Sequence, residues 1–307
     1  MGPDVFSNGF GVGPRRLDPT DKRTMLPPVV TTIAEVRAAV ADARRRGQTV
    51  GLVPTMGALH EGHAALIRAA RAASGFVVVS IFVNPTQFGP HEDFGRYPRT
   101  LEADQKVCAD AGADLIFAPG VPEMYPENAV TFVEVTKLQD ALEGPSRPGH
   151  FRGVCTVVAK LFNIVQPDVA HFGAKDYQQA RIITQMVRDL NVPVEVRVEP
   201  TVREPDGLAM SSRNRYLSPT ERASAPGIYQ ALRNVRDRAR AGEIDAARLE
   251  SALAAELAAI PGARVDYARV VDADTLRPIA RLDRPAVAAV AVFLGATRLI
   301  DNVSFGG

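Results

Sequence analysis

The chain has 307 residues, 46% hydrophobic and 23% charged residues, a net charge of +1 and two cysteines. This balance does not indicate nucleic acid or a membrane as partner, and two cysteines cannot make a disulfide framework. No apolar run approaches the roughly 20 residues that cross a bilayer, and the N-terminus lacks a signal-peptide pattern, so we expect a cytoplasmic protein.

The first two thirds of the chain predict a doubly wound α/β domain. Residues 1–30 are rich in glycine, proline and charge, which predicts a disordered lead-in. Residues 31–47 begin with threonines, carry apolar residues three and four apart and end in a basic turn and a glycine, as a capped helix does. Apolar runs then alternate with helical stretches: "TVGLVPT", "FVVVSIFVN", "ADLIFAP", "VAHFG" and "VEVRVEP". Such strands indicate a parallel sheet covered on both faces, a Rossmann-like fold over residues 31–201.

The remaining third has a different pattern. Two helical stretches, 219–242 and 244–260, are rich in alanine and arginine. They are followed by "VDYARVVDA" and "AVAAVAVFLGATRLIDNV", which we interpret as strands joined by a proline-containing connection. Helices followed by strands predict a smaller α+β domain over residues 202–307.

Two histidines, His60 and His63, follow the first long strand in "PTMGALHEGHAALIRAA". They could be zinc ligands, exposed residues of an ordinary helix, or phosphate contacts. "HEGH" lacks the spacing of a zincin motif, and no third ligand stands at a suitable distance, so we predict no protein-bound metal. Their place at a strand end and a helix start favours phosphate, because free amides and the positive end of the helix dipole attract an anion there. Gly62 between them would let phosphate approach the backbone.

Two further loops carry groups that suit phosphate. "GLAMSSRNRYL", residues 207–217, offers two serine hydroxyls and Arg213. "FGAKDYQQ", residues 172–179, places Lys175 and Asp176 at a predicted strand end. Each could be a solvated surface loop when taken alone. Three such loops at strand ends or a domain junction favour a phosphate-binding site.

Five motifs together resemble the pantothenate synthetase (pantoate–β-alanine ligase) family: "PTMGALHEGH", "FVNPTQF", "YPRT", "FGAKDYQQ" and "LAMSSRNRYL". "HEGH" is similar to the HIGH signature of class I nucleotidyltransferases, and "MSSRN" to their KMSKS loop. Those two motifs alone indicate only the superfamily, whereas "FVNPTQF" and "KDYQQ" specify the family. The resemblance covers residues 31–303.

The resemblance implies a reaction in which ATP, (R)-pantoate and β-alanine give pantothenate, AMP and diphosphate. Pantoate would attack the α-phosphorus to form pantoyl adenylate, and the β-alanine amine would then expel AMP. The implied cofactor is Mg²⁺, bound mainly through ATP oxygens, and the implied assembly is a homodimer. This chemistry needs positioning and charge stabilisation rather than a covalent protein nucleophile.

The resemblance also implies roles for particular residues. His63 would be the proton donor and His60 would support the phosphates, with Lys175 and Arg213 completing the catalytic set. Gln87 and Gln179 would hold pantoate, and Arg147 would contact the β-alanine carboxylate. The implied ATP-binding residues are Met56, Gly57, Ala58, Leu59, His60, Glu61, Gly62, His63, Lys160, Gly173, Ala174, Lys175, Asp176, Val202, Met210, Ser211, Ser212 and Arg213.

Two positions depart from the family pattern. Ala174 stands where the family usually has glutamate, and Thr86 replaces a common methionine. Two other functions stay open on the sequence. A nucleotidyltransferase acting on a phosphorylated cofactor precursor would share the histidines and the Ser-Arg loop, but it would not need "NPTQF" and "KDYQQ". A regulatory protein that binds nucleotide without catalysis would not need the intact histidines, lysines and Arg213.

Overall fold

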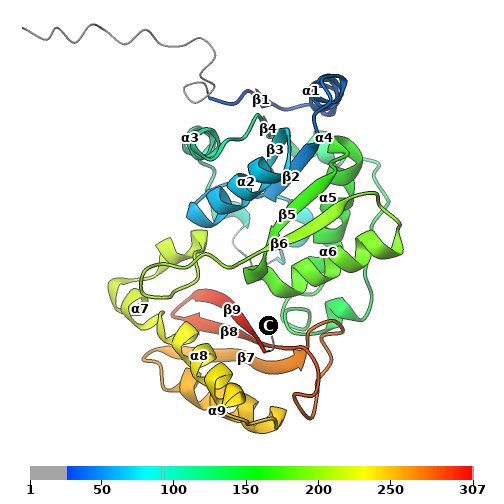
Figure 1. The fold of residues 1–307 in the computed structure, drawn as a ribbon. Coiled ribbons are helices and arrows are strands. Elements are labelled where there is room, and N and C mark those ends of the chain that lie inside the picture. Colours follow the sequence, from blue (N-terminus) through cyan, green and yellow to red (C-terminus); the bar gives the residue numbers. More distant parts are fainter. Residues whose placement is uncertain (1–25, 91, 93, 306–307) are drawn as a thin grey trace, which may run out of the picture.

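The computed structural model describes residues 26–305 except 91 and 93. A six-stranded parallel sheet with the order β1-β4-β3-β2-β5-β6 forms its N-terminal part (Figure 1). The strands are β1 (Val29–Val30), β2 (Val50–Thr55), β3 (Phe76–Ile81), β4 (Leu115–Phe117), β5 (Val169–Gly173) and β6 (Glu195–Glu199). The predicted doubly wound sheet is therefore confirmed.

The folded chain begins earlier than the sequence predicts. Val29 and Val30 form β1, which pairs in parallel with β4 through Val29–Ile116 and Val30–Phe117. The expected lead-in of residues 1–30 therefore extends too far, because its last two residues, both β-branched, form an edge strand of the sheet. Its first 25 residues lie outside the described part of the chain.

Helices cover both faces of this sheet. On one face, α2 (Glu61–Ala73) and α3 (Leu101–Ala111) bury a cluster around Ile67 and Val79. On the other, α1 (Ile33–Arg45), α5 (His150–Val165) and α6 (Tyr177–Asp189) bury a larger one. The short α4 (Val121–Met124) follows β4. Both faces of the strands are apolar because both are covered.

The C-terminal part is a three-stranded antiparallel sheet with helices on one face (Figure 1). Its elements are α7 (Pro219–Ser224), α8 (Gly227–Arg240), α9 (Ala246–Ala258), β7 (Ala263–Asp272), β8 (Ala286–Leu294) and β9 (Thr297–Phe305). The predicted helix 219–242 is wrong as one unit. Pro226 separates α7 from α8 because its ring cannot donate a backbone hydrogen bond and clashes with the preceding turn.

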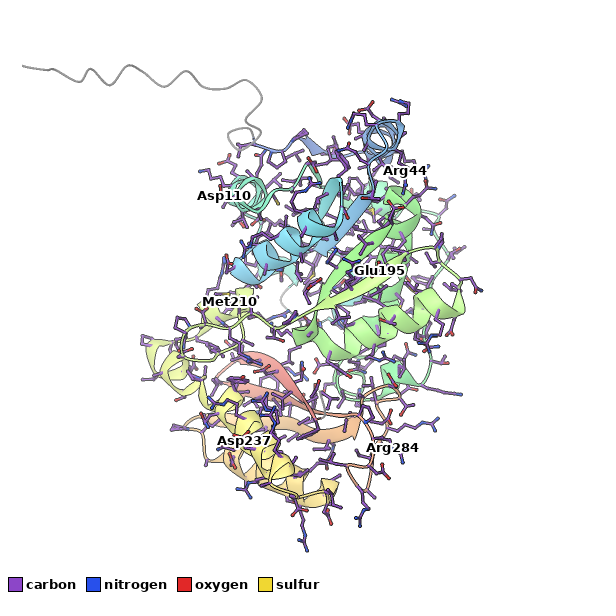
Figure 2. All side chains as sticks on the ribbon, viewed as in Figure 1. Arg44, Asp110, Glu195, Met210, Asp237 and Arg284 are labelled. Atoms are coloured by element: carbon purple, nitrogen blue, oxygen red, sulfur yellow. The ribbon has the colours of Figure 1, made fainter. Side chains whose placement is uncertain are left out.

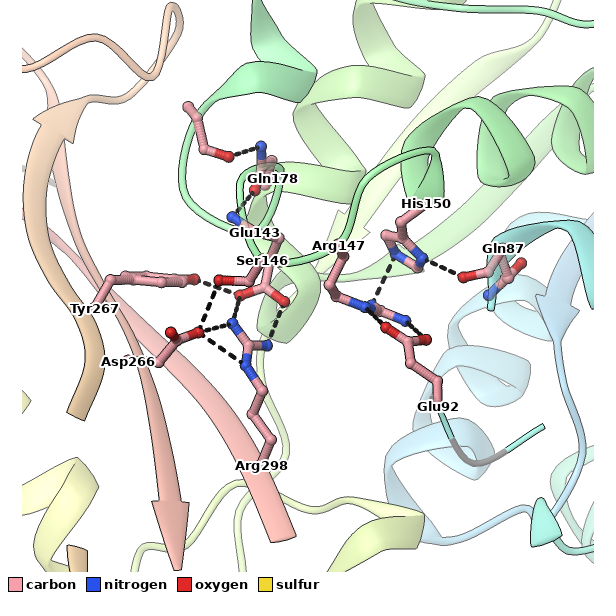
Figure 3. Close-up of polar contacts among 11 residues, drawn as sticks. Gln87, Glu92, Glu143, Ser146, Arg147, His150, Gln178, Asp266, Tyr267 and Arg298 are labelled. Atoms are coloured by element: carbon pink, nitrogen blue, oxygen red, sulfur yellow. Dashed lines mark hydrogen bonds and ion pairs between the residues drawn. The ribbon is translucent and has the colours of Figure 1, made fainter. Parts of the chain in front are cut away.

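Apolar and polar contacts join the two parts. Val271, Leu276 and Val287 belong to the same buried cluster as the apolar faces of α5 and α6. Beside it, Arg298 of β9 donates to both oxygens of the buried Glu143 carboxylate, at 2.6 and 3.0 Å (Figure 3). No helix within residues 26–305, positions 91 and 93 aside, is long and apolar enough to cross a membrane.

The strand order changes direction between β2 and β5. From β2 the chain moves through β3 to β4 on one side, and later through β5 to β6 on the other. The connections at such a switch point diverge, which leaves a crevice at the carboxyl ends of the two strands. Thr55 and Gly173 end these strands and face that crevice.

Candidate active site

A cavity of about 220 Å³ occupies the crevice between β2 and β5. The carboxyl ends of both strands, the start of α2, one face of α5 and the loop before α7 line it. Figure 2 shows Met210, from that loop, near the start of α2. Fourteen of the predicted site residues line the cavity: Met56, His60, Gly62, His63, Gln87, Gly173, Lys175, Asp176, Gln179, Val202, Met210, Ser211, Ser212 and Arg213.

The turn before the histidines is held from behind by a buried carboxylate. Ala58 has a left-handed backbone (φ +51°) although it is not a glycine, and it is 1% exposed. The Ala58 and Leu59 amides donate to the Asp104 carboxylate at 3.0 and 2.8 Å. Charge-assisted bonds of this kind stabilise a backbone that alanine alone disfavours. Asp104, which the sequence did not reveal, therefore fixes where α2 begins.

The two imidazoles cap α2 through Nδ1, which leaves Nε2 of each ring free of these backbone contacts. His60 Nδ1 accepts from the Gly62 amide at 3.1 Å, and His63 Nδ1 accepts from the His60 amide at 3.3 Å. Since Nδ1 is an acceptor in both rings, Nε2 carries the proton in both. Burial lowers the pKa of His60 to about 4 and that of His63 to about 3, so both are neutral near pH 7. The pair offers two neutral N–H donors.

Gly62 lines the cavity and has a second role besides the expected one. The sequence predicts that Gly62 makes room for phosphate. In the structure a Cβ at this position would lie 2.9 Å from the His60 ring. Because contacts this short force a neighbour to move, glycine is needed to keep the His60 imidazole in its capping position.

Acid stability tests the electrostatics of the buried histidines. Burial also lowers the pKa of His150 to about 4, whereas an unfolded histidine titrates near 6.5. The native state therefore binds the proton more weakly than the unfolded state, and stability is lost as pH falls from about 6.5 towards 4. In the His150→Gln variant we expect the free energy of unfolding to fall less over this pH range than in the wild type, by on the order of 2 kcal/mol. Urea unfolding between pH 7 and 4.5 measures this free energy for both proteins. Parallel pH profiles would contradict the prediction.

Gln87 lies in a second polar group, on the 3₁₀ turn η2 (Pro85–Gln87). The buried Asn84 donates to Gln87 Oε1 at 3.0 Å and to the Gly153 carbonyl at 3.1 Å. Gln87 Nε2 approaches Met56 Sδ at 3.2 Å. A Cβ on Gly153 would collide with the Thr86 carbonyl, so this glycine lets α5 pack directly on the turn. Asn84 and Gly153 are thus supports that the sequence reading missed.

The cationic side of the cavity comes from two separate segments. Lys175 lies in the 3₁₀ turn η5 (Ala174–Asp176), directly after β5. Burial lowers the pKa of its ammonium, which the neighbouring Asp176 and Asp301 partly offset. Ser212 and Arg213 begin η6 (Ser212–Tyr216), where the Ser211 hydroxyl accepts from the Arg213 amide at 3.2 Å.

Six predicted nucleotide contacts do not line the cavity. Gly57, Ala58 and Leu59 form the supporting turn, and Ala174 contributes its carbonyl to a bond from Asn302. Glu61 is exposed and pairs with Arg68. Lys160 lies on α5 with its ammonium 5.7 Å from the centre of the Tyr125 ring.

Arg147 lines a smaller neighbouring cavity of about 40 Å³. This cavity shares Lys175, Asp176 and Gln179 with the larger one. The Arg147 guanidinium binds both oxygens of the Glu92 carboxylate, at 2.6 and 2.7 Å, and approaches His150 Nε2 at 3.0 Å (Figure 3). Arg147, the predicted contact for the β-alanine carboxylate, is therefore already bonded to a carboxylate of its own chain.

Neither cysteine has the properties of a nucleophile. Cys108 and Cys155 are free and buried, and burial raises the pKa of each thiol to about 12. A thiol with so high a pKa is not ionised near neutral pH and is unreactive. We therefore expect neither cysteine to act as a nucleophile.

The doubly wound sheet, its switch-point cavity and the donors at the start of α2 define a nucleotide-binding α/β protein. A family model described as pantoate-beta-alanine ligase matches residues 28–304. The chain belongs to the pantoate–β-alanine ligase family.

Individual relatives agree over nearly the whole chain. Pantothenate synthetase from Moorella thermoacetica is 58% identical over 275 residues, which cover 90% of this chain and 97% of that one. The crystal structure of pantothenate synthetase from Thermus thermophilus matches with a TM-score of 0.85 and 51% identity, covering 90% and 98% of the two chains. Pantoate-beta-alanine ligase from Francisella tularensis, complexed with beta-gamma ATP and beta-alanine, matches with a TM-score of 0.74 and 34% identity, covering 90% and 97%.

Proposed function

We propose that this protein condenses (R)-pantoate with β-alanine at the expense of ATP, forming pantothenate, AMP and diphosphate through pantoyl adenylate. Membership of the pantoate–β-alanine ligase family supports this activity, as does the Francisella relative with its bound ATP compound and β-alanine. The observation that carries it is one cavity that joins the His60–His63 donors to the Gln87–Gln179 amides. A phosphate site and a polar organic-acid site thus share one space.

The first step requires charge stabilisation around the α-phosphate and the leaving diphosphate. A pantoate carboxylate oxygen attacks the α-phosphorus, and the bond to diphosphate breaks. His60 and His63 supply Nε2–H donors at the positive end of α2, and His63 acts as a hydrogen-bond donor in its neutral form. Lys175 and Arg213 line the same cavity and would add positive charge around the phosphates. Lys160 does not line this cavity.

The second substrate pocket has one polar and one apolar side. Gln87 and Gln179 provide amides that both donate and accept, which suits the carboxylate and hydroxyls of pantoate. Apolar side chains complete the wall: Val154, Val157, Val158, Leu161 and Phe172. They suit the branched carbon skeleton of pantoate.

In the second step the β-alanine amine attacks the acyl carbon and AMP leaves. We place the carboxylate of β-alanine on Arg147, in the smaller cavity beside Gln179. The β-alanine carboxylate would replace the Glu92 carboxylate, which accepts hydrogen bonds from the same Arg147 guanidinium.

Magnesium would be held mainly by ATP. Of the described residues that line the cavity, Asp176 alone carries a carboxylate. Mg²⁺ prefers an octahedral shell of oxygens and keeps several waters, so one carboxylate with phosphate oxygens and water fits it. The metal would neutralise charge on the leaving diphosphate.

We further propose two domains, residues 31–201 and 202–307, the second acting as a lid. Met210 to Arg213 then belong to the lid and meet the nucleotide when it closes, which excludes water from the acyl adenylate. A homodimer and a cytoplasmic location complete the proposal, on the basis of the family resemblance.

Pantothenate formation tests the function as a whole. Mass spectrometry should detect the product only when ATP, pantoate and β-alanine are all present. Diphosphate release that does not depend on pantoate would instead favour a nucleotidyltransferase acting on another substrate. Nucleotide binding with no turnover would favour a regulatory protein.

Gln179→Ala tests the assignment of the amide side. We expect the affinity for pantoate to fall about 10-fold, because a buried substrate polar group loses its partner, while the affinity for ATP changes little. Isothermal titration calorimetry measures both. Gln185→Ala, on the same helix with its amide bonded to Asp189, is the matched control. Equal losses for both ligands in Gln179→Ala would show that the assignment is wrong.

A further inference from the structure

Two consecutive residues of β9, Asp301 and Asn302, connect the C-terminal sheet to the segments that carry the phosphate-binding cations. β9 contacts both η5, which holds Lys175, and η6, which holds Arg213. Asp301 is 4% and Asn302 8% exposed. Both are polar side chains, so their burial requires hydrogen-bonding partners.

Asn302 is bonded to the turn that carries Lys175. Its side-chain Nδ2 donates to the Ala174 carbonyl at 2.9 Å and to the Lys175 carbonyl at 3.0 Å. Both protons of the amide are therefore used on two consecutive peptide groups of η5. The bonds cross from the C-terminal sheet to the end of β5, so they determine where this turn lies relative to β9.

Asp301 is bonded to the base of the other segment. Its carboxylate binds both terminal nitrogens of Arg203, at 2.6 and 2.9 Å. Arg203 begins a short hairpin in which it pairs with Ala209, and the Met210 amide donates to the Val202 carbonyl at 3.0 Å. This hairpin leads directly into Ser211, Ser212 and Arg213. Asp301 thus determines where the Ser-Arg loop starts.

The two side chains act on different segments because neighbours in a strand point to opposite faces. The backbone N–H of Asn302 also donates to Asp301 Oδ1 at 2.8 Å, which links the Asp301 carboxylate to the backbone of its neighbour. A stiff strand therefore separates the η5 turn from the hairpin by a fixed distance. Catalytic groups must be held within fractions of an ångström of their productive positions, so such supports matter for rate.

We propose that Asp301 and Asn302 are positioning residues for adenylate formation, Asn302 acting through Lys175 and Asp301 through the Ser211–Arg213 loop. This inference rests on the proposed function, in which Lys175 and Arg213 contact the phosphates. Both β9 residues line the smaller cavity, where the β-alanine carboxylate is placed, but neither lines the larger cavity that would hold ATP and pantoate. Their effect is on where the cations stand, and it should not extend to the amide side that binds pantoate.

A double-mutant cycle separates positioning from general stability. Four proteins besides the wild type are needed: Asn302→Ala, Lys175→Ala, the double variant, and Asn163→Ala as control. Asn163 also donates its Nδ2 to a backbone carbonyl, at 2.8 Å, but on the exposed side of α5. Single-turnover diphosphate release from ATP and pantoate gives the rate, pantoate titration gives affinity, and thermal unfolding reports folding.

We expect Asn302→Ala to slow adenylate formation about 10-fold and the control less than about 2-fold, with pantoate affinity unchanged in both. The double variant should be no slower than Lys175→Ala, because Asn302 has nothing left to position. Slowing by the product of the two single effects, or a wild-type rate for Asn302→Ala, would overturn the inference. If Lys175→Ala itself reacts normally, the proposed role of Lys175 is what fails.

Two further variants keep the test decisive. Should Asn302→Ala not fold, Asn302→Ser retains a short donor and enters the same cycle with Lys175→Ala. For the other half of the pair, Arg203→Gln breaks the contact with Asp301 but keeps the Asp301 charge beside Lys175. It should slow diphosphate release and show no additional effect in an Arg213→Ala background, because no guanidinium is left to position. Full additivity there would exclude action through the Ser211–Arg213 loop.

Discussion

His63→Ala should lower the rate of pantoyl adenylate formation by on the order of 10²-fold or more, the usual cost of losing a donor that acts at the transition state. The His63 ring is oriented by the His60 amide, which leaves its Nε2 proton for a phosphate oxygen. Its lowered pKa means that the donor is neutral. The rate should therefore not depend on a histidine titration near pH 6.5.

Pre-steady-state diphosphate release is the measurement for His63→Ala, with circular dichroism and ATP titration to show that the variant is folded. His63→Gln serves as the matched variant, because the glutamine amide can still donate an N–H. It should retain more activity than His63→Ala. Near-normal diphosphate release from folded His63→Ala would rule out a role in adenylation.

Arg213→Lys should slow the ATP-dependent half-reaction by on the order of 10²-fold although the charge is kept. A guanidinium donates through a planar fork, whereas lysine presents a compact ammonium that cannot bind two phosphate oxygens in the same way. Attack by β-alanine on preformed pantoyl adenylate should change far less, because diphosphate has already left by then.

Two single-turnover assays distinguish these cases, one started with ATP and pantoate and one with the adenylate and β-alanine. Arg215→Lys, two residues further along the same loop, is the control, because Arg215 does not line the cavity. Equal slowing of Arg213→Lys in both assays would move Arg213 from the diphosphate to the β-alanine site.

The sequence predicted well those features that depend on local pattern. Apolar runs such as "FVVVSIF" identify buried parallel strands, because only a strand covered on both faces is apolar throughout. The loops around His60, Lys175 and Arg213 were predicted to approach one another because each follows a strand end or a domain junction. His60, Lys175 and Arg213 all line the same cavity.

Features that depend on distant partners were not predictable in the same way. Asp104 binds the turn before His60 from a helix more than forty residues later, and nothing in "TLEADQ" distinguishes it from an exposed acid. Asn302 contacts η5 across an even longer separation. Lys160 shows the limit of residue type as a guide: a lysine suits phosphate, but the structure places its ammonium on α5 near the Tyr125 ring, and its contact with nucleotide stays a prediction.

The apolar residues Val271, Leu276 and Val287, which share a buried cluster with α5 and α6, have a consequence for biosynthesis. When the ribosome has completed β6, the side chains that cover this part of the cluster have not been made. At typical rates of translation the nascent chain waits roughly 4 to 18 s for them. During this interval it exposes an apolar surface, which is the kind of surface that chaperones bind and that causes aggregation when synthesis outpaces folding.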